Sequence, residues 1–205
     1  MGLYRDQLLP RFTHLTLNNR EFAKLRARIT AGLEGEVLEI GFGSGLNIPH
    51  YPAGVTRVWA VDPALVGRKM AAERVAARGV PTDYIGTDAQ AIPLADESVD
   101  HALSTWTLCT IPDPGKALAE VHRVLRPGGT LHFLEHGLSP DEKVARFQAR
   151  LTPLHRLIAG GCELNRPIEA LVRSAGLAMS RGTTYYTSGP RFTGYTYEGV
   201  AAKRR

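Results

Sequence analysis

Cysteine is scarce in this chain of 205 residues, which contains only Cys109 and Cys162. Two cysteines so far apart lack the close spacing of a metal-binding motif and provide at most one disulfide, so we expect no bound metal and a reducing compartment. Apolar runs are short as well: none reaches the ~18 residues of a membrane span, and the first residues lack the apolar core of a signal peptide. The composition therefore predicts one globular domain over residues 1–205, located in the cytoplasm without stable membrane insertion.

The glycine-rich segment that follows the first predicted strand lacks the features of two well-known phosphate-binding motifs. Glycines occupy every second position, Gly41, Gly43 and Gly45, after the short apolar run 37–40. Leu46 stands where a dinucleotide-binding motif has its third glycine, and no Gly-Lys-Ser/Thr sequence of a P-loop follows. A glycine turn between a strand and a helix still exposes backbone amides, so we expect a nucleotide-type cofactor here. For the glycines alone, an ordinary strand–turn–helix junction without a ligand is the alternative.

Acidic residues stand at the ends of the first two predicted strands. Glu39 lies two positions before Gly41, where a carboxylate would repel a pyrophosphate but suits a cationic ligand. Asp62 ends the strand predicted at 57–62, about 20 residues after Gly41, which is the offset at which an acid binds the hydroxyls of a ribose. Asp62 is also well placed to cap a helix that begins at Pro63, and the two roles are compatible.

A third acid, Asp88, follows the strand predicted at 82–86. A carboxylate at that point can accept a hydrogen bond from the exocyclic amine of adenine, while the next backbone N–H, that of Ala89, donates to the ring. Alone this signal is weak, because Asp88 can also cap a turn. Together with the two earlier acids, it indicates that one edge of a sheet binds a ligand with adenine and ribose parts.

The remaining elements complete an alternation of strands and helices. Further strands are predicted at 98–106 and 130–136, and helices at 63–79 and 115–125. Short connections in such an alternation produce a parallel sheet covered by helices on both faces, and ligands bind at its carboxyl edge. Thr105 and His136 lie at the ends of the fourth and fifth strands, so they are predicted to share this edge with the acids.

Two segments outside the predicted sheet are expected to surround this edge. Residues 1–33 are predicted to form an N-terminal helical cap, with Asn18 or Asn19 capping a helix, and residues 137–170 a helical insertion on the substrate side. The net charge of +5 arises in residues 139–205, which contain 11 Lys/Arg and 5 Asp/Glu. These bases are scattered, so a solvated basic surface is favoured over a nucleic-acid site, while an anionic substrate or a membrane surface remains open.

Four segments between residues 35 and 136 carry a resemblance to a known family: VLEIGFGSGLN, WAVDP, GTDAQAIPLADESVD and RVLRPGGTLHFLEH. They resemble the core of class I S-adenosylmethionine-dependent methyltransferases. The resemblance implies a Rossmann-like α/β fold, with a seven-stranded, mostly parallel sheet in the order 3-2-1-4-5-7-6 and helices on both faces. It also implies S-adenosyl-L-methionine as the cofactor, bound by Glu39, Gly41, Phe42, Gly43, Gly45, Asn47, Asp62, Pro63, Asp88, Ala89, Ser104 and Thr105.

The flanking sequences narrow the resemblance to a subgroup. STWTLCTIPDPGKALAEVHRVLRPGG, FLEHG and GYTYEGVA are similar to small bacterial methyltransferases related to the animal thiol S-methyltransferases. The expected reaction is methyl transfer to a small-molecule acceptor, a thiol or another sulfur or oxygen nucleophile. Trp106, Gln148, Cys162 and Arg166 are the candidate acceptor contacts. Cys162, beside two glycines, is otherwise expected to be a small buried side chain.

His136 is the candidate catalytic residue, because an imidazole with a pKa of about 6.5 can accept a proton from a thiol or phenol at physiological pH. Its alternative role is to satisfy backbone groups at the end of a strand. Methylation of a phospholipid headgroup or quinone at a membrane surface is the alternative function, and cofactor binding without catalysis is a third. Nucleic-acid methylation is disfavoured, because the fourth strand leads into no Asn/Asp-Pro-Pro-Tyr motif. The sequence predicts no particular oligomeric state.

Overall fold

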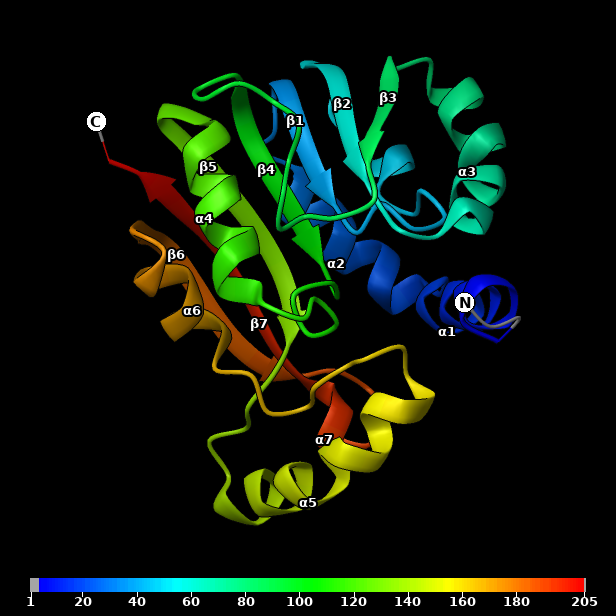
Figure 1. Ribbon diagram of the computed structural model, residues 1–205, viewed down its shortest axis with the longest axis vertical. Coiled ribbons are helices and arrows are strands. Elements are labelled where there is room, and N and C mark those ends of the chain that lie inside the picture. Colours follow the sequence, from blue (N-terminus) through cyan, green and yellow to red (C-terminus); the bar gives the residue numbers. More distant parts are fainter. Residues whose placement is uncertain (1–3, 205) are drawn as a thin grey trace.

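Seven strands form one continuous sheet, in the order β3-β2-β1-β4-β5-β7-β6 (Figure 1). The computed structural model describes residues 4–204, and its strands are β1 (Gly35–Ile40), β2 (Val55–Val61), β3 (Thr82–Gly86), β4 (Val99–Thr105), β5 (Leu125–His136), β6 (Leu177–Tyr186) and β7 (Tyr195–Lys203). β7 runs antiparallel to both of its neighbours, whereas the first five strands pair in parallel. The expected α/β fold, strand order and strand orientation are therefore confirmed.

Helices connect the strands, and local signals explain several of their ends. The helical segments are η1 (Tyr4–Leu8), α1 (Leu9–Leu17), α2 (Arg20–Thr30), η2 (Ile48–His50), α3 (Leu65–Arg78), α4 (Pro114–Val124), α5 (Glu142–Ile158), α6 (Ile168–Ser174) and α7 (Arg191–Gly194). The side chain of Asn19 accepts a hydrogen bond from the N–H of Phe22 at the start of α2, and Asp113 caps α4 through the N–H of Lys116. Gly79 ends α3 in the left-handed conformation, with φ of 70°.

The sheet divides the apolar core into two halves. Along β1, Val37 packs in one half and Leu38 in the other, because successive residues of a strand point to opposite faces. One half packs α4 and α6 against the sheet, through Leu118, Val121, Ile168 and Val172. The other packs α2 and α3, through Leu25, Ile29 and Ala71. Helices thus cover both faces of the sheet. Because both faces are apolar, the polar side chains of the parallel strands lie mainly at the strand ends.

The fifth strand is longer than its sequence indicates. The sequence predicts this strand at 130–136, but β5 begins at Leu125, which pairs with Val99. The register then shifts, and regular pairing resumes where Thr130 lies opposite His101. Leu125 is fully buried, so its burial in the core keeps the chain against the sheet before the Pro-Gly-Gly turn is complete.

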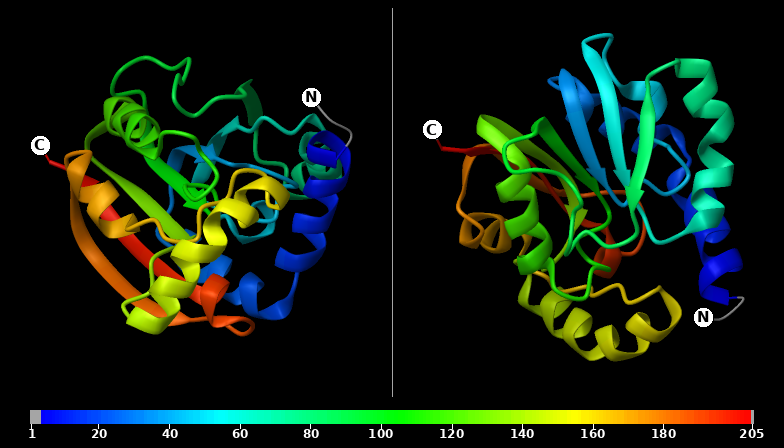
Figure 2. Two further views of the ribbon diagram at one scale, coloured as in Figure 1. Left: turned by 60° about the horizontal axis from the view of Figure 1, so that its bottom comes forward. Right: turned by 45° about the horizontal axis from the view of Figure 1, so that its top comes forward.

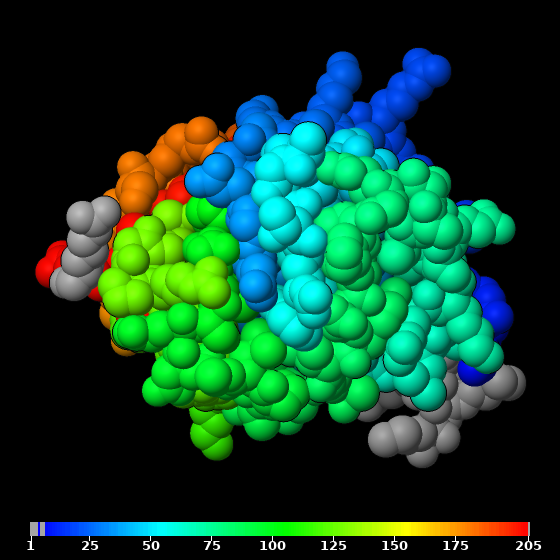
Figure 3. Space-filling model, turned by 90° about the horizontal axis from the view of Figure 1, so that it is seen from above, coloured from blue at the N-terminus to red at the C-terminus, as the bar shows by residue number. Residues whose placement is uncertain are grey.

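The parallel strands end at one edge, which the N-terminal helices and α5 surround. In Figure 1, α5 and α7 lie beyond the strand ends, and Figure 2 (left) turns this edge toward the reader, with α5 in yellow and the N-terminal helices in blue. Figure 3 shows the opposite edge, where the segments that lead into β1 (blue) and β2 (cyan) lie side by side and the segment that leads into β5 (lime) lies on the other side of β1. The Tyr4 hydroxyl donates a 2.5 Å hydrogen bond to the Ile158 carbonyl, which joins the N-terminal segment to the end of α5. Within residues 4–204, no helix is both long and apolar enough to cross a membrane.

Candidate functional site

Glu39, near the end of β1, is the centre of a buried polar network. Its Oε1 accepts a 2.7 Å hydrogen bond from the side-chain amide of Asn47, and its Oε2 accepts one from the Tyr51 hydroxyl. The Asn47 amide also donates to the Thr105 hydroxyl at 3.0 Å, which joins the ends of β1 and β4. The structure therefore brings together three of the residues predicted to bind the cofactor, namely Glu39, Asn47 and Thr105.

Arg26 of α2 completes this network, and sequence reasoning missed it. Its Nη1 donates to the side-chain oxygen of Asn47 at 2.8 Å and to the Thr105 hydroxyl at 3.1 Å, and its guanidinium lies 4.8 Å from the centre of the Trp106 ring. Burial lowers the pKa of Arg26 to about 10, so the group stays charged at neutral pH, and its buried Nε has no partner among the described residues. Its position four residues after Phe22, inside the apolar stripe of α2, is the signal that could have revealed it.

We expect the stability of the folded protein to fall as the pH rises through neutrality, and Glu39→Gln to weaken that dependence. Burial raises the pKa of Glu39 to about 7, whereas its ordinary value is 4.5. The folded state therefore binds this proton more tightly than the unfolded chain does, and the resulting stabilisation is complete below pH 4.5 and lost as the pH rises through about 7. Thermal unfolding of the wild-type protein and of Glu39→Gln at about pH 5 and about pH 8 measures this pH dependence of stability. Equal pH dependence in the two proteins would contradict this expectation.

The glycine turn after β1 lies against Asp62, which follows β2. The Asp62 carboxylate accepts 2.7 Å hydrogen bonds from the N–H groups of Gly43 and Ala64. Burial raises the pKa of Asp62, and these two hydrogen bonds oppose that shift. A Cβ built on Gly43 would meet nothing nearer than the Gly41 carbonyl oxygen at 3.9 Å, so open space adjoins the backbone there. The turn therefore leaves room for a ligand beside a carboxylate that can accept hydrogen bonds from hydroxyls.

The other residues near this turn that are predicted to contact the cofactor do not converge on one point. Asp88 is exposed, and its carboxylate accepts two 2.9 Å hydrogen bonds from the backbone and side chain of Gln90, while Ala89 is buried. Pro63 is exposed, whereas the side chain of Phe42 is buried in the core. Phe42 is therefore left with its backbone for contact with a cofactor, and the roles of these four predicted residues stay predictions.

Glu135 anchors the turn that follows β4, another role that sequence reasoning missed. This fully buried carboxyl accepts a 2.6 Å hydrogen bond from the Ser104 hydroxyl, and it accepts others from the N–H groups of Thr107 and Leu108 at 2.9 and 3.1 Å. Burial raises the pKa of Glu135 to about 7. Trp106 in this turn has a φ of 51°, which is strained for a bulky side chain, so the anchor holds the turn in a conformation it would not adopt alone.

His136 brings together the two cysteines, which are distant in the sequence. Its Nε2 lies 2.9 Å from the Cys162 sulfur, and the ligand atoms of Cys109, His136 and Cys162 all lie within 4.8 Å of one another. Hydrogen bonding from the Cys109 thiol, followed by that from His136 and His155, lowers the pKa of Cys162. The Nδ1 of His136 is buried without a partner among the described residues, so this imidazole does not satisfy backbone groups at the strand end. Cys162 is buried, as expected, but it contacts polar groups.

Gln148 and Arg166, two of the predicted acceptor contacts, use their side chains to join backbone segments. The Gln148 amide oxygen accepts a 3.0 Å hydrogen bond from the N–H of Ser139, and its amide nitrogen donates to two further carbonyls. The Arg166 Nη1 donates to the carbonyls of Leu108 and Ile111 at 2.5 and 2.7 Å. These bonds account for both buried side chains without a substrate, so their role as acceptor contacts stays a prediction that this geometry does not favour.

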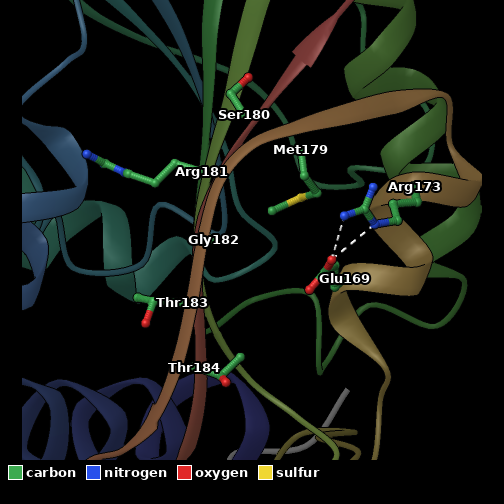
Figure 4. Close-up of a pocket in the computed structure, with 8 residues that line it drawn as sticks. All are labelled: Glu169, Arg173, Met179, Ser180, Arg181, Gly182, Thr183 and Thr184. Carbon is green, nitrogen blue, oxygen red and sulfur yellow. Dashed lines mark hydrogen bonds and ion pairs between the residues drawn. The ribbon is translucent and has the colours of Figure 1, made fainter.

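Two surface hollows lie apart from these residues. One, of about 280 Å³, lies between α6 and β6, where Figure 4 shows Glu169 and Arg173 paired on one side, with a 2.7 Å contact. The other, of about 570 Å³, lies between α3 and Tyr84. Neither hollow is lined by a residue predicted to bind the cofactor or the acceptor. The candidate site is therefore assigned from the convergence of side chains at the strand ends.

Comparisons with known proteins agree on the family to which this chain belongs. Residues 38–133 match the family described as "Methyltransferase domain". The chain is 32% identical to the human thiol S-methyltransferase TMT1A over 168 residues, which cover 80% of this chain and 66% of that protein. It is 30% identical over 198 residues to phthiotriol/phenolphthiotriol dimycocerosates methyltransferase 1 of Mycobacterium ulcerans, with 83% of this chain and 70% of that protein covered.

A solved structure shares the fold. The N-methyltransferase NodS from Bradyrhizobium japonicum, solved in complex with S-adenosyl-L-homocysteine, superposes with a TM-score of 0.73 over 98% of this chain and 100% of that chain, at 17% identity. The chain therefore belongs to the class I S-adenosylmethionine-dependent methyltransferases, and S-adenosylmethionine is the cofactor of this family. The matches span 56–66% of the length of the human and rodent thiol S-methyltransferases.

Proposed function

We propose that the protein transfers the methyl group of S-adenosylmethionine to a small thiol. The observation that carries the choice of acceptor is the similarity to thiol S-methyltransferases, for example the 32% identity to human TMT1A over 80% of this chain. The two thiols and the imidazole gathered at the end of β5 support a site suited to sulfur chemistry.

The carboxyl edge of the sheet offers a partner for each polar part of the cofactor. In this proposal, Glu39 accepts hydrogen bonds from the ammonium group of the methionine part, and Arg26, whose Nε has no partner among the described residues, pairs with its carboxylate. Asp62 accepts from the ribose hydroxyls, and Asp88 with the N–H of Ala89 binds adenine. When bound, the cofactor supplies a methyl group on a positively charged sulfur.

The task of the protein in this transfer is to position the acceptor and to exclude water. An in-line displacement requires the acceptor atom about 3–3.5 Å from the methyl carbon, with little covalent assistance. We assign the acceptor side to residues 137–170 and to the turn that carries Trp106, and the cover of the cofactor to the helices within residues 1–33. His136 lies at the end of β5, between these regions, where it can act on the acceptor.

We expect Asp62→Ala to weaken S-adenosylmethionine binding by about 1–3 kcal/mol, which corresponds to about 5–150-fold, because buried ribose hydroxyls would lose their acceptor. The Asp62 carboxylate also accepts hydrogen bonds from the N–H groups of Gly43 and Ala64, so its removal can also lower the stability of the folded protein. Thermal unfolding, measured beside the calorimetric titration, separates that effect from the loss of affinity. Asp62→Asn keeps one acceptor oxygen and is expected to lose less affinity. An unchanged affinity in Asp62→Ala would mean that the ribose lies elsewhere.

The reaction is tested by measuring S-adenosylhomocysteine production by the full chain with a panel of small thiols, phenols, amines and alcohols. We expect thiols to give the highest kcat/KM, because their deprotonated form is a strong nucleophile and is accessible near neutral pH. Titration with S-adenosylmethionine alone, in the same preparation, establishes that the protein is folded and binds its cofactor. Bound cofactor with turnover of phenols or amines but not of thiols would overturn the thiol assignment.

A lipid-like acceptor is the second candidate, and two observations favour it. The relative from Mycobacterium ulcerans is described as a methyltransferase of phthiotriol and phenolphthiotriol dimycocerosates. Large apolar side chains are also exposed on the helices around the carboxyl edge: Leu8, Phe12, Leu15, Leu154, Leu157 and Ile158. Phospholipids and quinones in vesicles therefore belong in the acceptor panel, and turnover that requires vesicles would favour this candidate over a free thiol.

A further inference from the structure

Two thiols and an imidazole converge on one point at the carboxyl edge of the sheet. Cys109 comes from the turn after β4, His136 is the last residue of β5, and Cys162 lies in the segment between α5 and α6. Their ligand atoms lie within 4.8 Å of one another, and the three residues are 2%, 9% and 7% exposed. We propose that Cys109, His136 and Cys162 bind a Zn²⁺ ion.

The ring of His136 faces the sulfurs and makes no hydrogen bond to the backbone among the described residues. Its Nε2 lies 2.9 Å from the Cys162 sulfur, so one imidazole nitrogen and two sulfurs meet in a buried space. Two sulfurs and one imidazole nitrogen are ligands that Zn²⁺ prefers over harder cations. Two thiolates with Zn²⁺ and a neutral imidazole carry no net charge, which removes the cost of burying unbalanced charges.

The backbone around the cluster is fixed by contacts between the segments that provide the sulfurs. The N–H of Glu163, next to Cys162, donates a 2.9 Å hydrogen bond to the carbonyl of Cys109. Arg166 ties the same two segments together, because it donates to the carbonyls that flank Cys109 at Leu108 and Ile111. The three ligands are thus held by neighbours that do not bind the metal, an arrangement that preorganises metal sites.

Three protein ligands leave one position of a tetrahedral zinc ion open, as in catalytic zinc sites. Resting on the proposed function, we assign this position to the acceptor thiol. A zinc ion held by these residues would lower the pKa of a thiol that binds it, so the acceptor would lose its proton to solvent and present a thiolate sulfur. The thiolate electron pair then forms a bond to the methyl carbon, while the bond from that carbon to the sulfonium sulfur breaks and S-adenosylhomocysteine leaves. In this scheme, His136 serves as a ligand and not as the proton acceptor.

The metal site is tested in the full chain without any measurement of activity. Elemental analysis after zinc loading and dialysis is expected to give one zinc per chain, and substitution with Co²⁺ to give thiolate-to-metal charge-transfer absorption. Cys109→Ser and Cys162→Ser are expected to lose more than about tenfold in affinity for Co²⁺. His122→Gln, at a partly exposed histidine of α4, is the control that should keep it. Failure of the reduced wild-type protein to bind either metal overturns the site, and so does full retention of binding in both cysteine variants.

The role of the metal at the acceptor has a separate test. A small thiol added to the Co²⁺ protein is expected to alter the absorption spectrum, whereas the matching alcohol is not. If the protein binds zinc but methylates no thiol, the proposed function fails and the metal site stands. If the zinc-free protein methylates thiols as fast as the zinc-loaded protein, the proposed function stands and the role of zinc at the acceptor is overturned.

Discussion

His136→Ala is expected to slow methyl transfer by about 10²–10⁴-fold, with S-adenosylmethionine affinity close to that of the wild type. The ring of His136 contacts the Cys162 sulfur and makes no hydrogen bond to the network around Glu39 or to Asp62. The imidazole therefore acts on the acceptor in either proposed role, as a proton acceptor or as a zinc ligand, and the metal analysis decides between the two. Turnover at saturating cofactor and calorimetric affinity are the two quantities to compare.

The control for this substitution is His122→Ala, which changes a partly exposed histidine of α4 and should leave both quantities unchanged. Equal losses of cofactor affinity and turnover in His136→Ala would indicate that the residue is structural. Turnover equal to that of the wild type would show that His136 has no role in the reaction.

Gly41→Ala is expected to destabilise the folded protein by about 2–5 kcal/mol and to weaken cofactor binding. Gly41 has a φ of 73°, and a Cβ there would lie 1.8 Å from the Thr107 Oγ1 and 2.6 Å from the Thr107 Cβ. Thr107 cannot easily move away, because its N–H donates to Glu135 and its hydroxyl to the Thr105 carbonyl. The left-handed backbone contributes about 1–2 kcal/mol and the overpacking about 1–3 kcal/mol of the expected loss. Denaturant unfolding measures the total.

Gly79→Ala separates the two contributions. Gly79 has a φ of 70°, almost the same as Gly41, but a Cβ built there would meet no atom within 4 Å. This variant is therefore expected to show the conformational cost alone, about 1–2 kcal/mol. Equal destabilisation by Gly41→Ala and Gly79→Ala would mean that Thr107 yields without cost, and the steric argument would be wrong.

The glycines, the strand-end acids and the alternation of elements were sufficient to predict a parallel sheet covered by helices and the edge at which a ligand is expected. These signals are local: a strand is recognised from a few consecutive residues, and its last residue marks where it ends. Because parallel strands all end at the same edge, local knowledge of Glu39, Asp62 and Thr105 already places them near one another. The same reasoning failed at Leu125, where burial of one side chain extends a strand into a turn sequence.

The sequence by itself therefore determined the α/β class and the edge at which the cofactor is expected, because both follow from short stretches of chain. Four such stretches also carried the resemblance to the family, and that resemblance implied the strand order. Only the tertiary structure decided which side chains meet across that edge. Arg26 reaches Asn47 from a helix outside the recognised motifs, and Cys109 meets Cys162 through two segments that are far apart in the sequence. The physical reason is that such contacts depend on how helices and turns pack beyond the strand ends, which no local spacing of residues encodes.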